Sequence, residues 1–286
     1  MRWKRARRSR NVEDRRGRPG RRVAAGGGLG LVGIAIVVVI GLLLGKSPME
    51  MLGFVAQLDG GAASSSAPSD PIDPNDPRVA FVEAILGETE DIWNELLDGR
   101  YPEPTLVLFT GRVQSACGSA SSAMGPFYCP ADRQIYIDLS FFEEMERSLG
   151  GGGDFAEAYV IAHEVGHHVQ HVTGLSEPVY EARRAGRSLQ GDGGLLVRQE
   201  LQADCLAGVW ANRAQQRHAW LEPGDIEEAL ATATAIGDDA LQRRSRGVVV
   251  PDSFTHGTAA QRARWFRRGF GSGDPGACDS FAAERL

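Results

Sequence analysis

Cysteine is scarce in this sequence, and four cysteines in 286 residues are too few for a small fold held together by disulfides. No C-x-x-C pair occurs, which disfavours a zinc site built from cysteine. A disordered, collagen-like or coiled-coil chain is also excluded, because 42% of the residues are hydrophobic, 24% are charged and 7% are aromatic. We therefore expect an ordinary globular protein, and the sequence contains no internal repeat.

Charge is distributed unevenly along the chain. Residues 1–22 contain eleven Lys and Arg but only Glu13 and Asp14, which gives this segment a net charge of +9. Since the whole chain carries −6, the other residues carry −15. Arginine clusters can bind nucleic acid, but this segment has no aromatic residue apart from Trp3, and membrane topology and anionic lipid explain its charge better. We therefore expect no nucleic-acid partner.

Residues 23–45 contain no charged residue. As a helix they would extend roughly 35 Å, enough to cross a bilayer core of about 30 Å. A cleaved signal peptide and a buried core helix are the alternatives, but the basic segment is long for a signal peptide. The basic excess before the run predicts a cytoplasmic N-terminus. We expect a single-pass protein of the cell membrane, with one transmembrane helix at 23–45, residues 1–22 in the cytoplasm and the domain that follows outside.

The rest of the chain divides into a linker and one domain. Residues 46–77 are the expected linker, since 59–77 is rich in Gly, Ser, Pro and Asp and cannot bury a core. Residues 78–286 have the length of a single domain. Their patterning predicts an α+β fold, mostly α, with a small β-sheet. The expected helices cover about 79–97, 154–173, 194–217, 225–244 and 258–268, and the expected strands cover 105–111 and 134–140.

His163, Glu164 and His167 form an H-E-x-x-H pattern on the predicted helix. Positions four apart share a helix face, so both imidazoles can bind one Zn²⁺ while Glu164 reaches a water on the metal. Ordinary core or surface histidines are the alternative. His171 lies about 12 Å beyond His163 along the axis, and His168 points about 100° away from His167, so neither is a good third ligand. The third ligand is therefore expected from another helix.

Glu200 and Asp204 lie four residues apart in an otherwise mostly apolar segment. Carboxylates in such a setting need a cation or hydrogen-bond donors to offset their lost hydration. We expect Glu200 to be the third ligand of one zinc ion, and Asp204 to accept the free ring N–H of a ligating histidine. A solvated acidic stripe is the alternative. No organic cofactor is expected.

The order of these motifs resembles a known family. H-E-x-x-H followed by E-x-x-A-D is similar to the gluzincin pattern, and GPFYCP, QIYID, AHEVGHHVQH, ELQADC and PDSFTHG, in this order, resemble the bacterial "putative neutral zinc metallopeptidase" family. The N-terminal segment with NVEDRRG and the apolar run are similar as well, so the resemblance covers nearly the whole chain. It implies a zincin-like metallopeptidase domain with His163, His167 and Glu200 as zinc ligands and Glu164 as the catalytic acid and base.

The resemblance extends to His256 and Arg262, which are spaced as in the T-H-P…R segment of membrane-bound prenyl-protein proteases. There a histidine helps to stabilise the oxyanion and an arginine supports the site, so both residues are expected to serve catalysis here. Gly257 replaces the proline of that segment in this chain. By analogy with strands near zincin sites, the strand at 134–138 is expected to pair with an extended substrate.

The predicted location outside the cytoplasm permits disulfide bonds. Four cysteines allow three connectivities, and we expect Cys117–Cys129 and Cys205–Cys278. The first bridge would stiffen a loop rich in Gly and Ser, and the second would tie the C-terminal region to the helix of Glu200. Cys205 as a nucleophile is a weaker alternative.

The expected function is that of a membrane-anchored zinc metalloendopeptidase. It would hydrolyse a peptide or protein substrate through a metal-activated water, with Glu164 as the general base, and residues 23–45 would bind the bilayer. The alternative is a catalytically inactive, zinc-containing binding or assembly protein at the membrane surface. Glu164 discriminates between the two, since a structural zinc site needs no general base.

Overall fold

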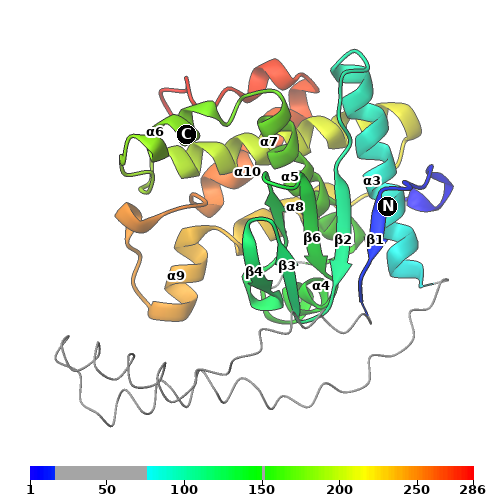
Figure 1. The fold of residues 1–286 in the computed structure, drawn as a ribbon, viewed down its shortest axis with the longest axis horizontal. Helices are drawn as coiled ribbons and strands as arrows, with labels where there is room; N and C mark the ends of the chain where they lie inside the picture. The colour runs from blue at the N-terminus through cyan, green and yellow to red at the C-terminus, as the bar shows by residue number, and fades with distance from the viewer. Residues whose placement is uncertain (17–75, 150–151) are drawn as a thin grey trace, which may run out of the picture. The chain divides into compact units, whose positions relative to one another are not determined.

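The computed structural model describes residues 1–16, 76–149 and 152–286. Helices predominate in this part of the chain, as expected for a mostly α member of the α+β class (Figure 1). The helices are α3 Pro77–Leu96, α4 Ser140–Glu144, α5 Asp154–Val172, α6 Glu177–Arg184, α7 Leu195–His218, α8 Asp225–Ala235, α9 Asp238–Arg246 and α10 Ala259–Ser272. The strands are β1 Val12–Asp14, β2 Thr105–Phe109, β3 Arg112–Ser115, β4 Gly118–Ser121, β5 Phe127–Cys129 and β6 Gln134–Asp138.

The larger sheet has the strand order β1-β2-β6-β5. Strands β1, β2 and β6 run parallel, and β5 pairs with β6 in the antiparallel direction, with Tyr128 opposite Ile135. Strands β3 and β4 form a separate antiparallel pair. The strand expected to pair with substrate, QIYID, is β6, and it has neighbours on both sides. That expectation is therefore wrong, because a strand whose two edges are both paired cannot accept a third strand.

Helix α5 lies at the centre of the helical part and packs against α3, α7 and α8 (Figure 1). Helices α7 and α10 pack especially closely, because Gly269 has no side chain: a Cβ there would lie 1.8 Å from the carbonyl oxygen of Cys205. The expected single helix over 225–244 is in fact two helices, α8 and α9, separated at Ile236 and Gly237. A Cβ at Gly237 would lie 2.4 Å from the backbone nitrogen of Ala259, so the chain turns there against the start of α10.

Residues 1–16, the described part of the expected head at 1–22, belong to the same compact unit as the domain expected at 78–286. Strand β1 pairs with β2, in register from Val12 opposite Leu106 to Asp14 opposite Leu108. The carboxylate of Glu90, which is 1% exposed, accepts hydrogen bonds from Arg7 at 2.7 Å and from Ser9 at 2.5 Å. Basic residues of this segment thus pair with acidic residues of the domain.

Both cysteine pairs form the expected disulfides, Cys117–Cys129 and Cys205–Cys278. The first joins the turn between β3 and β4 to β5, and the second joins α7 to the 3₁₀ turn at Pro275–Cys278. In the part of the chain that the structure describes, no helix has both the length and the apolar character needed to cross a membrane. The expected transmembrane helix at 23–45 and the linker up to residue 75 lie outside the described residues.

The contacts of Arg7 lead to a prediction about stability. Replacing Arg7 with Gln removes a charged donor from the buried Glu90 carboxylate, and we expect the free energy of unfolding to fall by about 1–3 kcal/mol. Arg5→Gln is the matched control, because Arg5 is exposed and no ion pair of it occurs among the described residues. Urea unfolding of the full chain measures both variants. Equal stability of the two variants would contradict the integration of residues 1–16 into the fold.

Candidate metal centre

Helix α5 presents the three residues of the H-E-x-x-H pattern on adjacent turns. The rings of His163 and His167 lie one above the other, with centroids 4.8 Å apart, as their spacing of four residues requires. His163 and Glu164 are each 7% exposed, because their helix is surrounded by other helices. All three side chains line one cleft.

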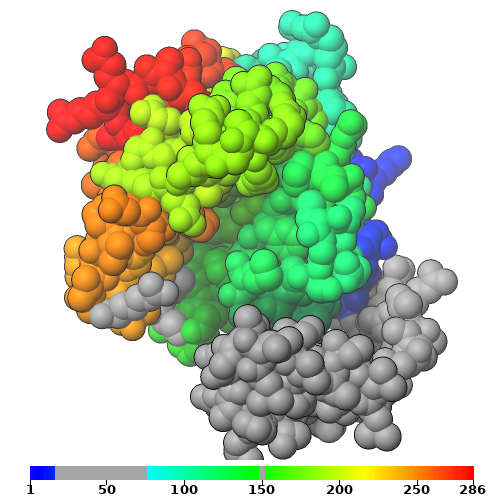
Figure 2. Space-filling model, turned by 60° about the vertical axis from the view of Figure 1, so that its left-hand side comes forward, coloured from blue at the N-terminus to red at the C-terminus, as the bar shows by residue number. Residues whose placement is uncertain are grey.

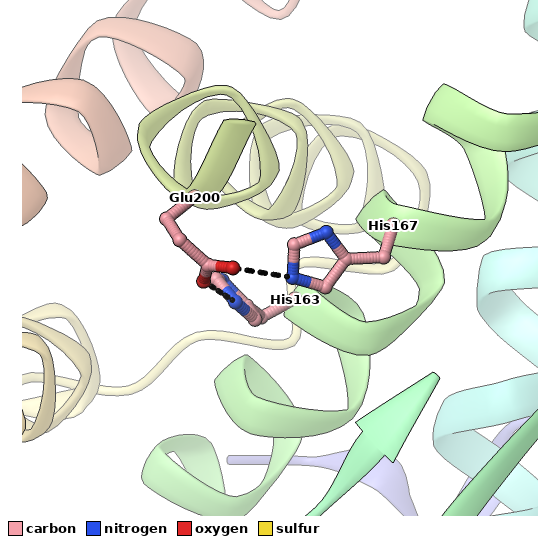
Figure 3. Close-up of side chains that lie close together, drawn as sticks. All are labelled: His163, His167 and Glu200. Carbon is pink, nitrogen blue, oxygen red and sulfur yellow. Dashed lines mark hydrogen bonds and ion pairs between the residues drawn. The ribbon is translucent and has the colours of Figure 1, made fainter. Parts of the chain in front are cut away.

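Helix α7 brings Glu200 to the two histidines (Figure 3). One carboxylate oxygen of Glu200 lies 3.1 Å from Nε2 of His163, and the other lies 3.4 Å from Nε2 of His167. Gly166 permits this close approach of α5 and α7, because a Cβ there would lie 3.0 Å from the carbonyl oxygen of Ala203. The structure thus brings together the three residues expected to be ligands.

The arrangement of these atoms fits a zinc ion. In a tetrahedral site with bonds of about 2.0–2.1 Å, neighbouring ligand atoms lie roughly 3.3 Å apart. The separations of 3.1 and 3.4 Å, which involve the two different oxygens of Glu200, are close to this value, and one ligand atom from each of the three residues lies within 4.8 Å of the others. The Nδ1 atoms are already engaged, that of His163 by Asp204 at 2.8 Å and that of His167 by Gln170 at 2.9 Å. Each Nε2 is therefore the atom left for a metal.

Carboxylates dominate the electrostatics of this group. Burial opposes a charge on His163, but the Asp204 carboxylate outweighs burial and raises the pKa of His163 to about 10. Burial likewise opposes a charge on His167, whose pKa is raised by Glu200. The pKa of Glu200 is held well below its usual range despite burial, chiefly by His167. An environment that favours imidazolium cations in this way also favours a bound divalent cation.

Asp204 orients the His163 ring through Nδ1, the ring nitrogen that is not available to the metal. Its carboxylate has no exposed surface, and it accepts hydrogen bonds from Nδ1 of His163 at 2.8 Å and from the Tyr159 hydroxyl at 2.6 Å. Arg262 donates two more, each at 2.9 Å. Burial would raise the pKa of Asp204, but Arg262 and His163 lower it to about 2. Arg262, expected to be catalytic, thus contacts Asp204 and acts on the site through it.

His256 also lines the cleft, and it is held by Asp238, a residue that the sequence did not suggest. One oxygen of Asp238 accepts hydrogen bonds from three successive backbone N–H groups, those of Thr255, His256 and Gly257, at 2.7, 2.6 and 3.0 Å. The other oxygen lies 3.4 Å from Nδ1 of His256 and raises the pKa of that imidazole. Gly257 has a φ of +87°, a backbone conformation that proline cannot adopt. Gly257, which stands where the T-H-P…R segment has proline, therefore permits the backbone conformation of this turn.

The cleft has a volume of about 610 Å³ and lies between three parts of the fold. Figure 2 shows it as a hollow bordered by the orange α9 region, the yellow-green α6 and α7, and the green segment that contains β5. Its apolar walls are formed by Met124, Phe127, Phe141, Val160 and Ile236 among others. Glu164 opens onto this space, and its carboxylate makes no hydrogen bond or salt bridge with the described residues.

Two other sets of possible ligands among the described residues lie outside this site. His168, next to His167, is fully buried and bonds away from the metal-binding atoms, to the Pro102 carbonyl. A second carboxylate group, Asp154 with Asp225 and Glu228, lies at the start of α5. The α-ammonium group of Met1 lies 3.0 Å from Asp154, so this group already has a cation, and we assign no metal to it.

Comparison with known proteins places this site in a family. The family model described as "putative neutral zinc metallopeptidase" matches residues 1–281, and the chain belongs to this family. It is 46% identical to the protein YpfJ of Escherichia coli (strain K12), over 98% of this chain and 99% of that protein. It is also 46% identical to Rv2575 of Mycobacterium tuberculosis (strain ATCC 25618 / H37Rv), over 72% of this chain and 71% of that protein. No solved structure gives a significant match.

The raised pKa of His163 predicts how zinc binding depends on pH. With a pKa of about 10 in the metal-free site, His163 carries a proton at pH 7 that zinc must displace. Zinc affinity should therefore rise as the pH increases from 6 towards 9, and binding at pH 7 should release protons to the buffer. Titration calorimetry in buffers of different ionisation enthalpy measures both effects. Binding with no proton release would contradict the assigned environment of His163.

Proposed function

We propose that this protein is a zinc-dependent endopeptidase with a zincin-like site and one catalytic zinc ion. The observation that carries the proposal is the position of Glu164, which lines the cleft next to a group of three candidate ligands and whose carboxylate has no hydrogen-bond or ion-pair partner among the described residues. A general base must be able to accept a proton and must reach the reacting water, and we propose Glu164 for this role because it lines the cleft and directly follows the ligand His163 in the chain. Membership of the zinc metallopeptidase family supports the same reaction class.

Each residue of the site has a distinct role in this proposal. A zinc ion held by His163, His167 and Glu200 would supply a Lewis acid that polarises the scissile carbonyl and acidifies water. Glu164 takes a proton from the attacking water and passes it to the amine leaving group. His256, positioned by Asp238, offers an N–H donor to the negative charge that develops on the carbonyl oxygen.

Residues behind the ligands keep this geometry constant. Arg262 binds Asp204 through two hydrogen bonds, and Asp204 fixes the tautomer and the ring orientation of His163. The cleft, with a volume of about 610 Å³, has room for a short peptide segment, and we propose that the protein cleaves internal bonds rather than removing terminal residues. A catalytically inactive zinc-binding protein is the second candidate, but such a protein needs neither a free Glu164 nor an open cleft.

We further propose that the domain works outside the cytoplasm, attached to the membrane by residues 23–45. Two disulfides support an oxidising compartment. The pairing of strand β1 with β2 supports a common compartment for residues 1–16 and the domain. A single crossing of the bilayer between residues 16 and 76 would separate these strands. We therefore propose that residues 1–16 lie on the same side of the membrane as the domain rather than in the cytoplasm.

The general-base role of Glu164 can be tested directly. Glu164→Gln keeps the size of the side chain but removes the base, so kcat/KM for peptide hydrolysis should fall by about 10²- to 10⁴-fold with zinc still bound. Glu157→Gln is the matched control, because Glu157 lies on the same helix outside the cleft. Hydrolysis of a mixed peptide library and zinc content are measured on the full chain. Hydrolysis at the wild-type rate by Glu164→Gln would refute the proposal.

The side of the membrane occupied by residues 1–16 is also testable. Arg5 and Asp252 are both exposed, so a cysteine at either position is reachable by a thiol reagent. We expect Arg5→Cys and Asp252→Cys to react alike with a maleimide that cannot cross the cell membrane. The reagent is applied to intact cells whose outer envelope has been made permeable, so that it reaches the outer face of that membrane. Labelling of Asp252→Cys alone would show instead that residues 1–16 lie in the cytoplasm.

A further inference from the structure

His168 is a buried histidine that the proposed mechanism does not use. It follows His167 directly, but successive residues point about 100° apart around a helix, so its ring lies on another face of α5. Its Nε2 donates a hydrogen bond to the carbonyl oxygen of Pro102 at 2.5 Å, and its Nδ1 lies 3.1 Å from the Tyr128 hydroxyl. The ring is therefore held at both nitrogens.

Tyr128 connects His168 with a second histidine. Its hydroxyl lies 2.7 Å from Nδ1 of His171, and its ring meets the His168 ring edge-on, with centroids 5.3 Å apart. Because a carbonyl can only accept, neutral His168 carries its proton on Nε2 and accepts from the Tyr128 hydroxyl at Nδ1. The Tyr128 oxygen in turn accepts from Nδ1–H of His171. The result is one continuous chain of hydrogen bonds from Pro102 to His171.

This chain of bonds joins the metal-binding helix to the edge strand of the sheet. Tyr128 is the middle residue of β5, which pairs with β6 on one side and has no strand on its other side among the described residues. Residues of β5 line the cleft. A strand of three residues with one neighbour is weakly held by backbone bonds alone. The Cys117–Cys129 disulfide restrains its end, and the Tyr128 hydroxyl ties its middle to α5 at His168 and His171, within about one turn of His167.

We propose that Tyr128 is a positioning residue, which through His168 and His171 fixes strand β5 relative to the metal ligands. The role rests on the proposed peptidase function, since a fixed strand beside the cleft holds an extended peptide backbone in line with Glu164. Tyr128 does not touch the reacting atoms in this scheme. Loss of its hydroxyl should therefore weaken substrate binding more than it slows the chemical step.

The test is Tyr128→Phe in the full chain, which keeps the ring and removes only the hydroxyl. We expect KM for a peptide substrate to rise by roughly 3- to 10-fold with kcat changed less than twofold, as expected for one hydrogen bond. Backbone amides of residues 127–129 should exchange with deuterium faster, while those of β2 should not, and zinc content should be unchanged. Tyr101→Phe is the control, because the Tyr101 ring also meets the His168 ring edge-on, with centroids 5.4 Å apart, but its hydroxyl has no hydrogen-bond partner among the described residues and it is not among the residues that line the cleft.

Two readouts separate this inference from the proposed function. Hydrogen exchange and zinc content need no substrate, so they test the connection between Tyr128 and helix α5 even if the wild type hydrolyses nothing. Unchanged exchange at residues 127–129 would overturn the inference whatever the activity. Faster exchange throughout the domain would also overturn it, because Tyr128 would then serve general stability. A fall in kcat with constant KM would contradict the positioning role as well.

Discussion

A buried carboxylate can remain charged only if donors and a cation surround it, and Asp204 meets this condition through Arg262, Tyr159 and His163. These partners come from α10 and α5, while Asp204 itself lies on α7. Removing one member of such a buried charged group typically costs about 3–5 kcal/mol. The interaction thus couples the packing of three helices to the orientation of a metal-binding imidazole, and the rest of the site is built around it.

The charge division along the chain has a different meaning in the folded protein from the one that it suggested. Residues 1–22 carry a net charge of +9 and the remaining residues carry −15, a difference that predicted a cytoplasmic N-terminal segment and a domain outside the cytoplasm. In the structure, Arg7 pairs with Glu90 and Arg16 with Asp76, so much of the basic charge is met by the acidic domain itself.

The sequence alone was sufficient to predict candidate site residues where metal-binding or acidic side chains repeat at the spacing of a helix turn. His163 with His167, and Glu200 with Asp204, lie four apart on helices, so their shared faces could be predicted without knowing the fold. Asp238 could not be predicted, because it acts on a loop 17–19 residues away through backbone N–H groups, which leave no mark in the sequence. Strand β1 was missed for a related reason: three residues, VED, have too little patterning to indicate a strand whose partner lies about 90 residues further along the chain.

The central claim is that His163, His167 and Glu200 bind one zinc ion that peptide hydrolysis requires. The most direct measurement is to remove bound metal from the full chain with a chelator, add zinc back in steps, and follow hydrolysis at each step. The account predicts that activity rises linearly and stops rising at one zinc per chain, and that His167→Ala gains no activity. Full zinc binding without hydrolysis, or equal recovery of activity by His167→Ala, would contradict it.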